Sequence, residues 1–246
     1  MSNFPTVAVI LAGGLGTRLR DTVPDLPKPM APVAGRPFLE HLLLYWVRQG
    51  VRRFVLSVGY RHEVIESHFR DSYLGCSIVY VREPRPLGTG GGLMLCQRNL
   101  QLREPFILLN GDTFFKVALQ DLHQQAQVQG GDWVISLFPT TDVRRYLPVT
   151  IAATGRVEFS NSAAHSKTSG LQLANGGVYW VHPRALDPFI RHEGYLSLEG
   201  EIFPRCQELG QHVVGLTSDA TFIDIGVPAD YARAQVLSCF EYARLD

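Results

Sequence analysis

The feature that most constrains the fold is an alternation of apolar runs with amphipathic segments from residue 7 to residue 112. Residues 7–12, VAVILA, are uninterruptedly apolar and end in glycine, which is typical of a strand buried on both faces of a parallel sheet. From Pro37, which is tolerated in a first helical turn, apolar residues recur at helical spacing. Further strands and helices are expected in turn over 53–60, 63–69, 76–81, 89–100 and 105–112. This alternation predicts a doubly wound α/β fold.

The pattern changes after Asp121. Short runs interrupted by polar residues favour an antiparallel addition rather than another strand-helix-strand unit. The expected strands cover 132–140, 147–153, 156–161, 174–183, 212–217 and 221–226, with helices over 197–209 and 228–242. No linker, repeat or low-complexity tract divides the chain. We therefore expect one α/β domain over residues 1–246, a Rossmann-like mixed sheet with an inserted antiparallel lobe.

Composition excludes several classes of function. Lys plus Arg equals Asp plus Glu at 23 each, so no global field draws the chain toward nucleic acid or a membrane surface. The N-terminus lacks the pattern of a signal peptide, and no apolar run reaches the length of a membrane span, so we expect a cytoplasmic protein. Cys76, Cys96, Cys206 and Cys239 are widely spaced and indicate buried free thiols rather than a zinc site or a redox pair.

A glycine-rich turn, AGGLGTR, follows the first strand. It would place several backbone N–H groups at the carboxyl edge of the sheet, where α/β folds bind ligands, and glycine lets a backbone approach an anion closely. The turn lacks the GK[ST] of a Walker loop, and Leu19 stands where a dinucleotide-binding fingerprint needs its third glycine. Taken alone, it is either a phosphate site or a tight structural turn.

The residues after the turn favour a phosphate site. Arg18 and Arg20 follow it directly, and Lys28 stands between Pro27 and Pro29, which restrict the backbone to extended geometry. A lysine held in this way beside an amide-lined turn suits a polyphosphate. Without that setting, Lys28 would be read as a solvated surface residue.

Seven segments, in order and over nearly the whole chain, carry a resemblance to a known family. They are LAGGLGTRLR, PKPMAPVAGRPFLEHLL, EPRPLGTGGGL, LLNGDTFF, ANGGVYWV, LEGEIFP and FIDIGVPADY. With them the sequence resembles the sugar-1-phosphate nucleotidyltransferases, also called nucleotide-sugar pyrophosphorylases. The resemblance implies the nucleotide-diphospho-sugar transferase fold, with a mainly nucleotide-binding half over 1–120 and a mainly sugar-phosphate-binding half over 121–246.

The family reaction joins a sugar 1-phosphate to a nucleoside triphosphate by in-line attack on the α-phosphorus, with release of pyrophosphate. It needs positioned cations rather than covalent help from the protein. By resemblance, the catalytic residues are Arg18, Lys28, Asp112 and Asp224. The nucleotide-binding residues are Leu11, Ala12, Gly13, Gly14, Gly16, Thr17, Glu83, Gly88, Thr89 and Asp112. The sugar-phosphate-binding residues are Gly111, Asn175, Gly176, Glu199 and Lys167.

Two of these residues form the expected metal site. Asp112 and Asp224 each end an apolar strand, and Mg²⁺ takes carboxylate oxygens together with substrate phosphates. The pair would match the metal-binding aspartates of the family, so Mg²⁺ is the expected cofactor. A single strand-end aspartate more often caps a turn or a helix.

Glu83 bears on the choice of base. A carboxylate accepts hydrogen bonds and would match the adjacent N1–H and N2–H₂ donors of guanine, whereas uracil and thymine favour an amide such as Gln. This favours GTP. In the alternative, Glu83 points to solvent or pairs with Arg85.

The sequence departs from the family at one place. The family usually carries a Glu-Lys pair after V-x-x-F, and this chain has Asn161 and Ser162 there. Lys167 could supply the missing charge, because a flexible lysine acts as a point charge and tolerates displacement.

The sequence leaves alternatives open. Its motif spacing is most similar to members that act on D-glycero-α-D-manno-heptose 1-phosphate, with mannose 1-phosphate next and glucose 1-phosphate with UTP, CTP or dTTP after it. A catalytically silent, nucleotide-sugar-binding regulatory subunit is an alternative of another class, motivated by the missing Glu-Lys pair. Nucleic-acid binding is disfavoured by the neutral charge. An exposed apolar helix face could make a homodimer.

Overall fold

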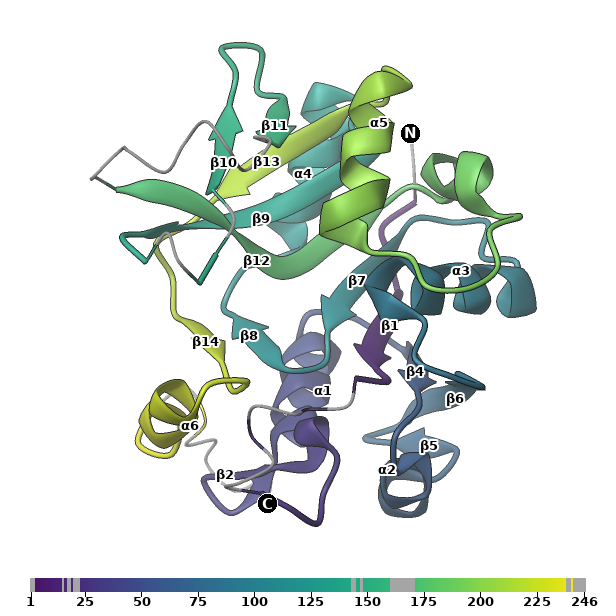
Figure 1. The fold of residues 1–246 in the computed structure, drawn as a ribbon, viewed down its shortest axis with the longest axis vertical. Helices are drawn as coiled ribbons and strands as arrows, with labels where there is room; N and C mark the ends of the chain where they lie inside the picture. The colour runs from purple at the N-terminus through teal and green to yellow at the C-terminus, as the bar shows by residue number, and fades with distance from the viewer. Residues whose placement is uncertain are drawn as a thin grey trace.

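The computed structural model describes residues 3–14, 16, 19, 23–142, 145–146, 148–159, 171–237 and 240. Within these ranges ten strands form one mixed sheet with helices on both faces (Figure 1). The strands are β1 (Val7–Ala12), β4 (Arg53–Val58), β5 (Ser72–Tyr73), β6 (Cys76–Arg82), β7 (Phe106–Asn110), β9 (Trp133–Thr140), β10 (Pro148–Ile151), β11 (Val157–Phe159), β12 (Gln172–Val181) and β13 (Val213–Thr217).

Two small ladders lie beside the main sheet. One pairs β2 (Pro32–Val33) with β3 (Arg36–Pro37), and the other pairs β8 (Thr113–Phe115) with β14 (Phe222–Asp224). The α-helices are α1 (Phe38–Arg48), α2 (His62–Phe69), α3 (Gly88–Leu100), α4 (Leu119–Gln129), α5 (Phe203–Glu208) and α6 (Pro228–Ala234). Short helical turns are η2 (Lys28–Met30), η3 (Pro183–Phe189) and η4 (Leu198–Ile202), the last of π type.

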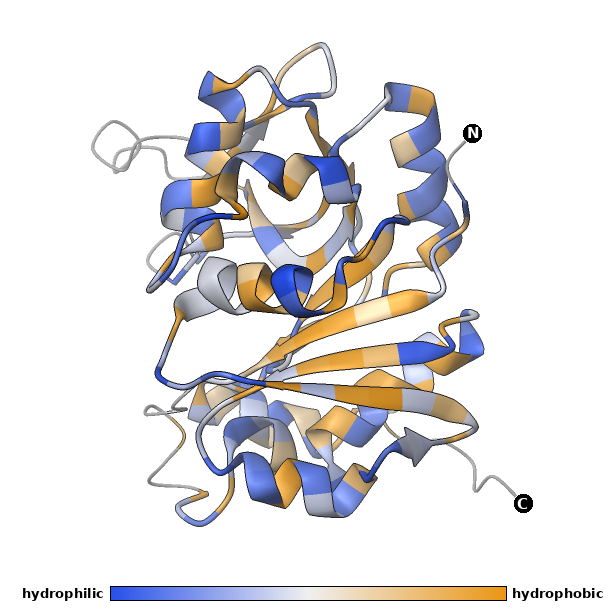
Figure 2. Cartoon of the chain, turned by 90° about the vertical axis from the view of Figure 1, so that its right-hand side faces the viewer, coloured by the Kyte–Doolittle hydropathy of each residue, from blue (hydrophilic) through white to orange (hydrophobic). Residues whose placement is uncertain are grey.

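The strand β1 shows why the chain builds two cores. Successive side chains of a strand point to opposite faces. Ala8, Ile10 and Ala12 pack into a core with α1, α2 and α4, whereas Val9 packs into a second core with α3, η3 and α5. Because both faces are covered, the strand is apolar throughout, and the central strands are the most hydrophobic part of the molecule (Figure 2).

The order in which the chain adds strands to the sheet reverses at β1. The chain passes from β1 to β4 and β6 on one side and returns to β7 on the other, and all of these pairings are parallel. In open α/β sheets, ligands bind outside the carboxyl ends of the strands at such a switch point. The segments that follow Ala12 and Asn110 therefore face each other there, because Leu11 pairs with Asn110.

The second half extends the same sheet with antiparallel strands. β12 pairs antiparallel with β9 on one edge, and on the other edge with β10 at residues 173–174 and with β7 at residues 178–181. The register against β9 shifts between Asn175 and Tyr179. Residues 175–177 thus form a bulge where the other edge of β12 changes partner.

The predicted fold class is confirmed, but several elements differ from the predictions. The sequence pattern did not indicate α4, because LQDLHQQAQVQ is mostly polar and buries chiefly Leu119, Leu122 and Ala126. The helix expected over 197–209 is a π turn followed by α5. The closing helix expected over 228–242 ends at Ala234.

Two predictions made from composition can be compared with the structure. Cys76, Cys96 and Cys206 are buried free thiols, as expected, and Cys239 lies outside the described residues. In the described part of the chain, no helix has both the length and the apolar character needed to cross a bilayer.

Candidate active site

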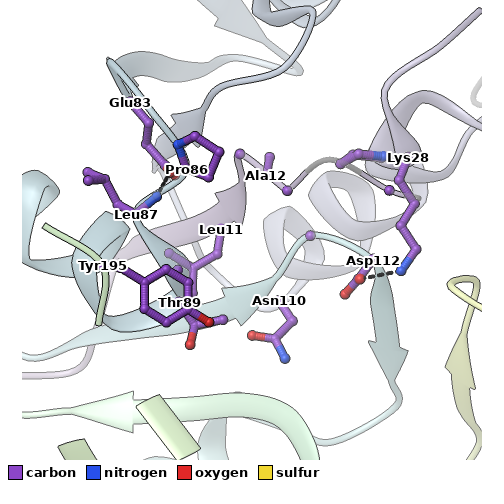
Figure 3. Close-up of a pocket in the computed structure, with 16 residues that line it drawn as sticks. Leu11, Ala12, Lys28, Glu83, Pro86, Leu87, Thr89, Asn110, Asp112 and Tyr195 are labelled. Carbon is purple, nitrogen blue, oxygen red and sulfur yellow. Dashed lines mark hydrogen bonds and ion pairs between the residues drawn. The ribbon is translucent and has the colours of Figure 1, made fainter. Parts of the chain in front are cut away.

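A cavity of about 450 Å³ opens at the switch point of the sheet (Figure 3). Its walls come from the turn after β1, from η2, from the segment that leads into α3, and from the end of β7. The lining residues are Leu11, Ala12, Gly13, Gly14, Gly16, Lys28, Pro29, Glu83, Pro86, Leu87, Gly88, Thr89, Asn110, Gly111, Asp112 and Tyr195.

Most of the predicted nucleotide-binding residues line this cavity. They are Leu11, Ala12, Gly13, Gly14, Gly16, Glu83, Gly88, Thr89 and Asp112, and the predicted catalytic Lys28 and sugar-side Gly111 lie with them. Arg18, Thr17 and Lys167 lie outside the described residues. Their predicted roles stay predictions.

Glycines bring the two sides of the switch point into contact. The Gly111 amide donates to the Leu11 carbonyl at 2.9 Å, and a Cβ on Gly111 would lie 2.6 Å from that oxygen. A Cβ on Gly13 would overlap the carboxylate of Glu83. Larger residues at either position would displace backbone or a buried side chain, so the close approach requires glycine.

Lys28 joins the two predicted metal ligands. Its Nζ lies 2.5 Å from Asp112 Oδ2 and 3.9 Å from Asp224 Oδ1, and its side chain is largely buried. Pro27 is extended and precedes the η2 turn, Lys28 is the first residue of that turn, and Pro29 follows inside it. The extended geometry expected for Lys28 is therefore wrong, because the Met30 amide donates to the Pro27 carbonyl and closes the turn around Lys28. The two prolines still restrain the backbone on either side of Lys28. A Cβ on Gly226 would meet Lys28 Nζ and Asp224 Oδ1, so any side chain there would displace one of the two charged groups.

This arrangement fits a divalent cation. The ammonium group of Lys28 already occupies the space between two carboxylates, which shows that they converge on one cationic centre. No cluster of three or more acidic, histidine or cysteine side chains that could hold a metal occurs in the described ranges. Two carboxylates alone suit Mg²⁺, because Mg²⁺ commonly takes one or two protein carboxylates and completes its shell with substrate phosphates and water.

Asp224 has a second cationic partner, which sequence reasoning missed. Arg145 Nη2 lies 3.0 Å from Asp224 Oδ2 and 2.5 Å from Asp230 Oδ2, and all three side chains are mostly buried. Burial lowers the pKa of Arg145, but its hydrogen bonds with Asp224 and Asp230 outweigh burial, and the net pKa is raised. The guanidinium therefore remains charged.

The carboxylate of Glu83 turns inward at the back of the cavity. Oε1 accepts a hydrogen bond from the Ser57 hydroxyl at 2.8 Å. Oε2 accepts one from the Leu87 amide at 3.2 Å (Figure 3). Burial raises the pKa of Glu83, and these two hydrogen bonds partly counter the effect. The alternative in which Glu83 points to solvent does not describe this geometry. Each oxygen keeps a further lone pair for a ligand.

Two of the predicted sugar-side residues, Asn175 and Gly176, lie at the bulge of β12, and side-chain hydrogen bonds join Asn175 to Glu199 in η4. Asn175 Nδ2 donates to the Tyr179 hydroxyl at 2.7 Å and to Glu199 Oε1 at 3.4 Å, and Tyr179 donates to the same oxygen at 3.3 Å. Gly176 is buried against Phe115. The cluster therefore orients Glu199 from β12.

Thr89 connects this cluster to the cavity. Its hydroxyl donates to Glu199 Oε2 at 3.3 Å and accepts from the Leu198 amide at 2.9 Å. Thr89 belongs to the first turn of α3 and lines the cavity, so the predicted base-side and sugar-side residues share one hydrogen-bonded wall.

Several residues of the site were not predicted from the sequence. Asn110 and Tyr179 were expected only as interior residues of the strands over 105–112 and 174–183. Tyr195 is an exposed aromatic residue at the mouth of the cavity, beside Gly88. Arg145 lies in a segment without periodicity. The NGD and NGG motifs could have drawn attention to Asn110 and to the neighbourhood of Tyr179, but nothing local indicated Arg145.

Comparison with known proteins covers nearly the whole chain. The model of a family described as "Nucleotidyl transferase" matches residues 7–239. The chain is 38% identical over 228 residues to a D-glycero-alpha-D-manno-heptose 1-phosphate guanylyltransferase of Aneurinibacillus thermoaerophilus, covering 93% of this chain and 96% of that protein. It is 36% identical over 224 residues to a protein of the same name from Campylobacter jejuni, covering 91% and 96%.

A solved structure is also similar to this chain over nearly its whole length. HddC from Yersinia pseudotuberculosis, complexed with GMP-PN, superposes with a TM-score of 0.78 at 32% sequence identity. The match covers 94% of this chain and 98% of that one. The similarity therefore includes both the parallel half and the antiparallel extension of the sheet.

Proposed function

Because this chain belongs to the nucleotidyl transferase family, we propose that it joins a sugar 1-phosphate to GTP and releases pyrophosphate. The preferred sugar is D-glycero-α-D-manno-heptose 1-phosphate, on which the two bacterial relatives act according to their names. The product is then the GDP-sugar. The phosphate oxygen of the sugar phosphate attacks the α-phosphorus of GTP in line.

The observation that carries this proposal is the cluster of Lys28, Asp112 and Asp224 at the end of the glycine-lined cavity. Two anionic substrates repel each other, and phosphoryl transfer is catalysed mainly by positioning and charge neutralisation. A restrained lysine beside backbone amides positions the phosphates and neutralises part of their charge. Mg²⁺ bound by Asp112 and Asp224 supplies the further positive charge on the phosphates.

The chain's own residues have distinct roles in this proposal. The backbone of Gly13, Gly14 and Gly16 binds the triphosphate, and Lys28 moves from its contact with Asp112 to a phosphate oxygen. Asn175, Gly176 and Glu199 hold the sugar phosphate, with Glu199 accepting hydrogen bonds from sugar hydroxyls. We further propose the division into a nucleotide half, 1–120, and a sugar-phosphate half, 121–246.

Glu83 selects the base in this proposal. Its buried carboxylate accepts hydrogen bonds from N1–H and N2–H₂ of guanine. The Yersinia relative, whose structure was solved with GMP-PN, supports a guanine nucleotide. The inward carboxylate, held by Ser57 and Leu87, supports Glu83 as the base-reading group.

A panel assay tests the proposal. The purified protein is incubated with Mg²⁺ and each of GTP, ATP, CTP, UTP and dTTP, crossed with heptose, mannose and glucose 1-phosphates. We expect the fastest pyrophosphate release with GTP and heptose 1-phosphate, and the GDP-sugar in the mass spectrum. The Asp112→Asn variant gives the background rate.

The panel separates the alternatives. A preference for mannose 1-phosphate with GTP would correct the sugar, and a preference for UTP or dTTP would overturn the role of Glu83. Binding without turnover in any combination would favour a regulatory subunit. If Lys167→Ala leaves the KM for the sugar phosphate unchanged, Lys167 does not replace the family lysine.

Two further expectations remain part of the proposal. Cell fractionation tests the cytoplasmic location, and sedimentation of the purified protein tests the homodimer. Neither affects the assignment of the site.

A further inference from the structure

The carboxylate of Asp224 is held by different partners at its two oxygens. Oδ1 accepts a hydrogen bond from the Gly226 amide at 2.7 Å and lies 3.9 Å from Lys28 Nζ. Oδ2 contacts Arg145 Nη2 at 3.0 Å, and the same nitrogen donates to the Asp224 carbonyl at 3.3 Å. Oδ1 thus faces the cationic centre shared with Asp112, whereas Oδ2 is engaged on the other side.

The short strand around Asp224 leaves the orientation of the carboxylate to its own contacts, which are the Gly226 amide at Oδ1 and Arg145 at Oδ2. β14 has three residues and pairs only with the three residues of β8 within the described part of the chain. In that register Asp224 is the last strand residue, opposite Thr113. A short ladder fixes the position of Cα but leaves the rotation of a terminal carboxylate to its own contacts.

Arg145 is itself held in place. Its Nη2 contacts Asp230 Oδ2 at 2.5 Å, and its guanidinium lies over the Tyr146 ring, 4.8 Å from the centroid. Asp230, in the first turn of α6, also pairs with Arg233 at 3.1 Å. The Arg145 side chain is 20% exposed and that of Asp230 is 14% exposed, so the contact is not a loose surface pair.

Asp230 lies between two arginines and offsets part of their charge. A free positive charge beside Asp224 would repel a divalent cation, but Asp230 pairs with Arg145 at one oxygen, and Arg233 at the other oxygen is half exposed, where solvent screens its charge. The remaining effect of Arg145 is on the orientation of the Asp224 carboxylate. Groups that bind a ligating carboxylate from behind set which lone pair faces the metal, and their loss typically weakens metal binding.

We infer that Arg145 is a positioning residue for the metal: it binds Asp224 Oδ2 so that Oδ1 faces Asp112 across the cation site. The inference rests on the proposed function, in which Asp112 and Asp224 hold Mg²⁺. It assigns to α6, through Asp230, a part in shaping that site.

The test measures metal binding without turnover. Mn²⁺, which is paramagnetic, is titrated into each full-length variant with GTP present and sugar phosphate absent, and free Mn²⁺ is followed by electron paramagnetic resonance. We expect Arg145→Ala to weaken Mn²⁺ binding about 10-fold to 100-fold. Arg145→Lys keeps the positive charge but lacks the planar guanidinium group, so it should weaken Mn²⁺ binding less than Arg145→Ala does.

Two variants make the test independent of folding. Asp230→Asn keeps Arg145 but weakens its anchor, and should weaken Mn²⁺ binding by an intermediate amount. Arg184→Ala is the matched control, because Arg184 pairs with Asp132 at 2.6 Å at the opposite end of β12. It should bind Mn²⁺ as the unaltered protein does. Urea unfolding of every variant identifies any that does not fold.

Unchanged or tighter Mn²⁺ binding in folded Arg145→Ala, while the unaltered protein binds Mn²⁺, would overturn this inference and leave the proposed function intact. So would an equal loss in Arg184→Ala. If Arg145→Ala does not fold, unchanged binding in Arg145→Lys and Asp230→Asn would overturn it. Failure of the unaltered protein to bind Mn²⁺ would overturn the proposed metal site together with this inference.

Discussion

The two walls beside the active-site cavity differ in the atoms that they present. The first wall is formed by the turns after β1 and β7 and by the start of α3, and it is built from glycine backbone. Gly13, Gly88 and Gly111 in this wall, called the backbone wall below, pack against other backbone or a buried carboxylate. The wall at the bulge of β12 is built from polar side chains, with Tyr179 and Glu199 hydrogen-bonded to each other.

This difference has a physical origin. Parallel strands β1 and β7 end at one edge, so their following loops present N–H groups, which suit phosphates. β12 instead has its bulge in mid-strand, and the side chains of Asn175 and Tyr179 there are hydrogen-bonded to Glu199, which contacts the cavity-lining Thr89. The backbone wall should tolerate no added side-chain volume, whereas the side-chain wall should respond to the loss of single hydrogen bonds.

The largest effect is expected for Asp112 and Asp224, the two proposed metal ligands. Asp112→Asn and Asp224→Asn should each lower kcat by about 10²-fold to 10³-fold, because each removes one of two carboxylates from the same charge-stabilising site. The double variant should lose little more than either single one. Steady-state kinetics with Mg²⁺ measures this.

Asp219→Asn is the control for the aspartate variants, because Asp219 is exposed and lies only five positions before Asp224. It should leave kcat unchanged. Fully additive losses in the double variant would show that the two aspartates act separately and would contradict a shared metal.

The backbone wall is tested by adding one methyl group. Gly88 has φ +73°, and a Cβ there would lie 2.6 Å from the Leu196 carbonyl. Gly35, at φ +80°, has open space around its Cβ position. Gly35→Ala should cost about 1–2 kcal/mol of backbone strain. Gly88→Ala should cost a further ~1–3 kcal/mol for the overlap and raise the KM for GTP.

Urea unfolding and GTP kinetics of the two glycine variants give the comparison. Equal losses of stability in the two variants, with GTP binding unchanged, would mean that the backbone around Gly88 shifts to accommodate the methyl group without loss of free energy. The backbone wall would then be less constrained than its packing indicates.

Substitution of Glu83, the proposed base-reading residue, is expected to have a smaller effect. Glu83→Gln should reduce the preference for GTP over UTP about 10-fold to 100-fold, because an amide cannot accept from both guanine donors. Burial raises the pKa of Glu83, and only its ionised form is the double acceptor. The KM for GTP should therefore rise as pH falls through that raised pKa.

The Gln variant is also the control for pH, since it shares the ionisation of GTP but lacks the carboxyl group. Its KM should rise less at low pH. An identical pH profile in both proteins, with GTP preference retained, would remove Glu83 from base recognition.

The sequence predicted the backbone wall better than the side-chain wall. Lys28 and Asp112 could be placed together because the first follows β1, the second follows β7, and parallel strands end at one edge. By contrast, the contact of Arg145 with Asp224 depends on a three-residue ladder outside the main sheet, and Arg145 lies in a segment without periodicity. Local patterns carry no information about such a pairing.

The same reasoning explains the other omissions. The partners of Tyr179 depend on a register shift in β12, and an alternating apolar pattern does not reveal a bulge. The helix α4 was missed because its buried stripe is narrow and glutamines fill the rest. In each case tertiary packing, not local propensity, decides the structure.

The smallest effect is expected at the side-chain wall. Tyr179 is fully buried, and burial raises its pKa well above the ordinary value, so its neutral hydroxyl donates to Glu199. Tyr179→Phe removes that donor and should raise the KM for the sugar phosphate about threefold to tenfold, with the KM for GTP unchanged.

Tyr80→Phe is the matched control for this variant, because the Tyr80 hydroxyl also donates one hydrogen bond, to the Arg70 carbonyl at 2.6 Å. Tyr80 lies on β6, which β7, β1 and β4 separate from β12 and Tyr179. The Tyr80→Phe variant should alter neither KM. If Tyr179→Phe raised the KM for GTP as much as that for the sugar phosphate, the displaced Glu199 would also have disturbed Thr89 at the start of α3, to which it is hydrogen-bonded. The two walls would then act as one unit, and the contrast between backbone and side-chain recognition would not correspond to two substrates.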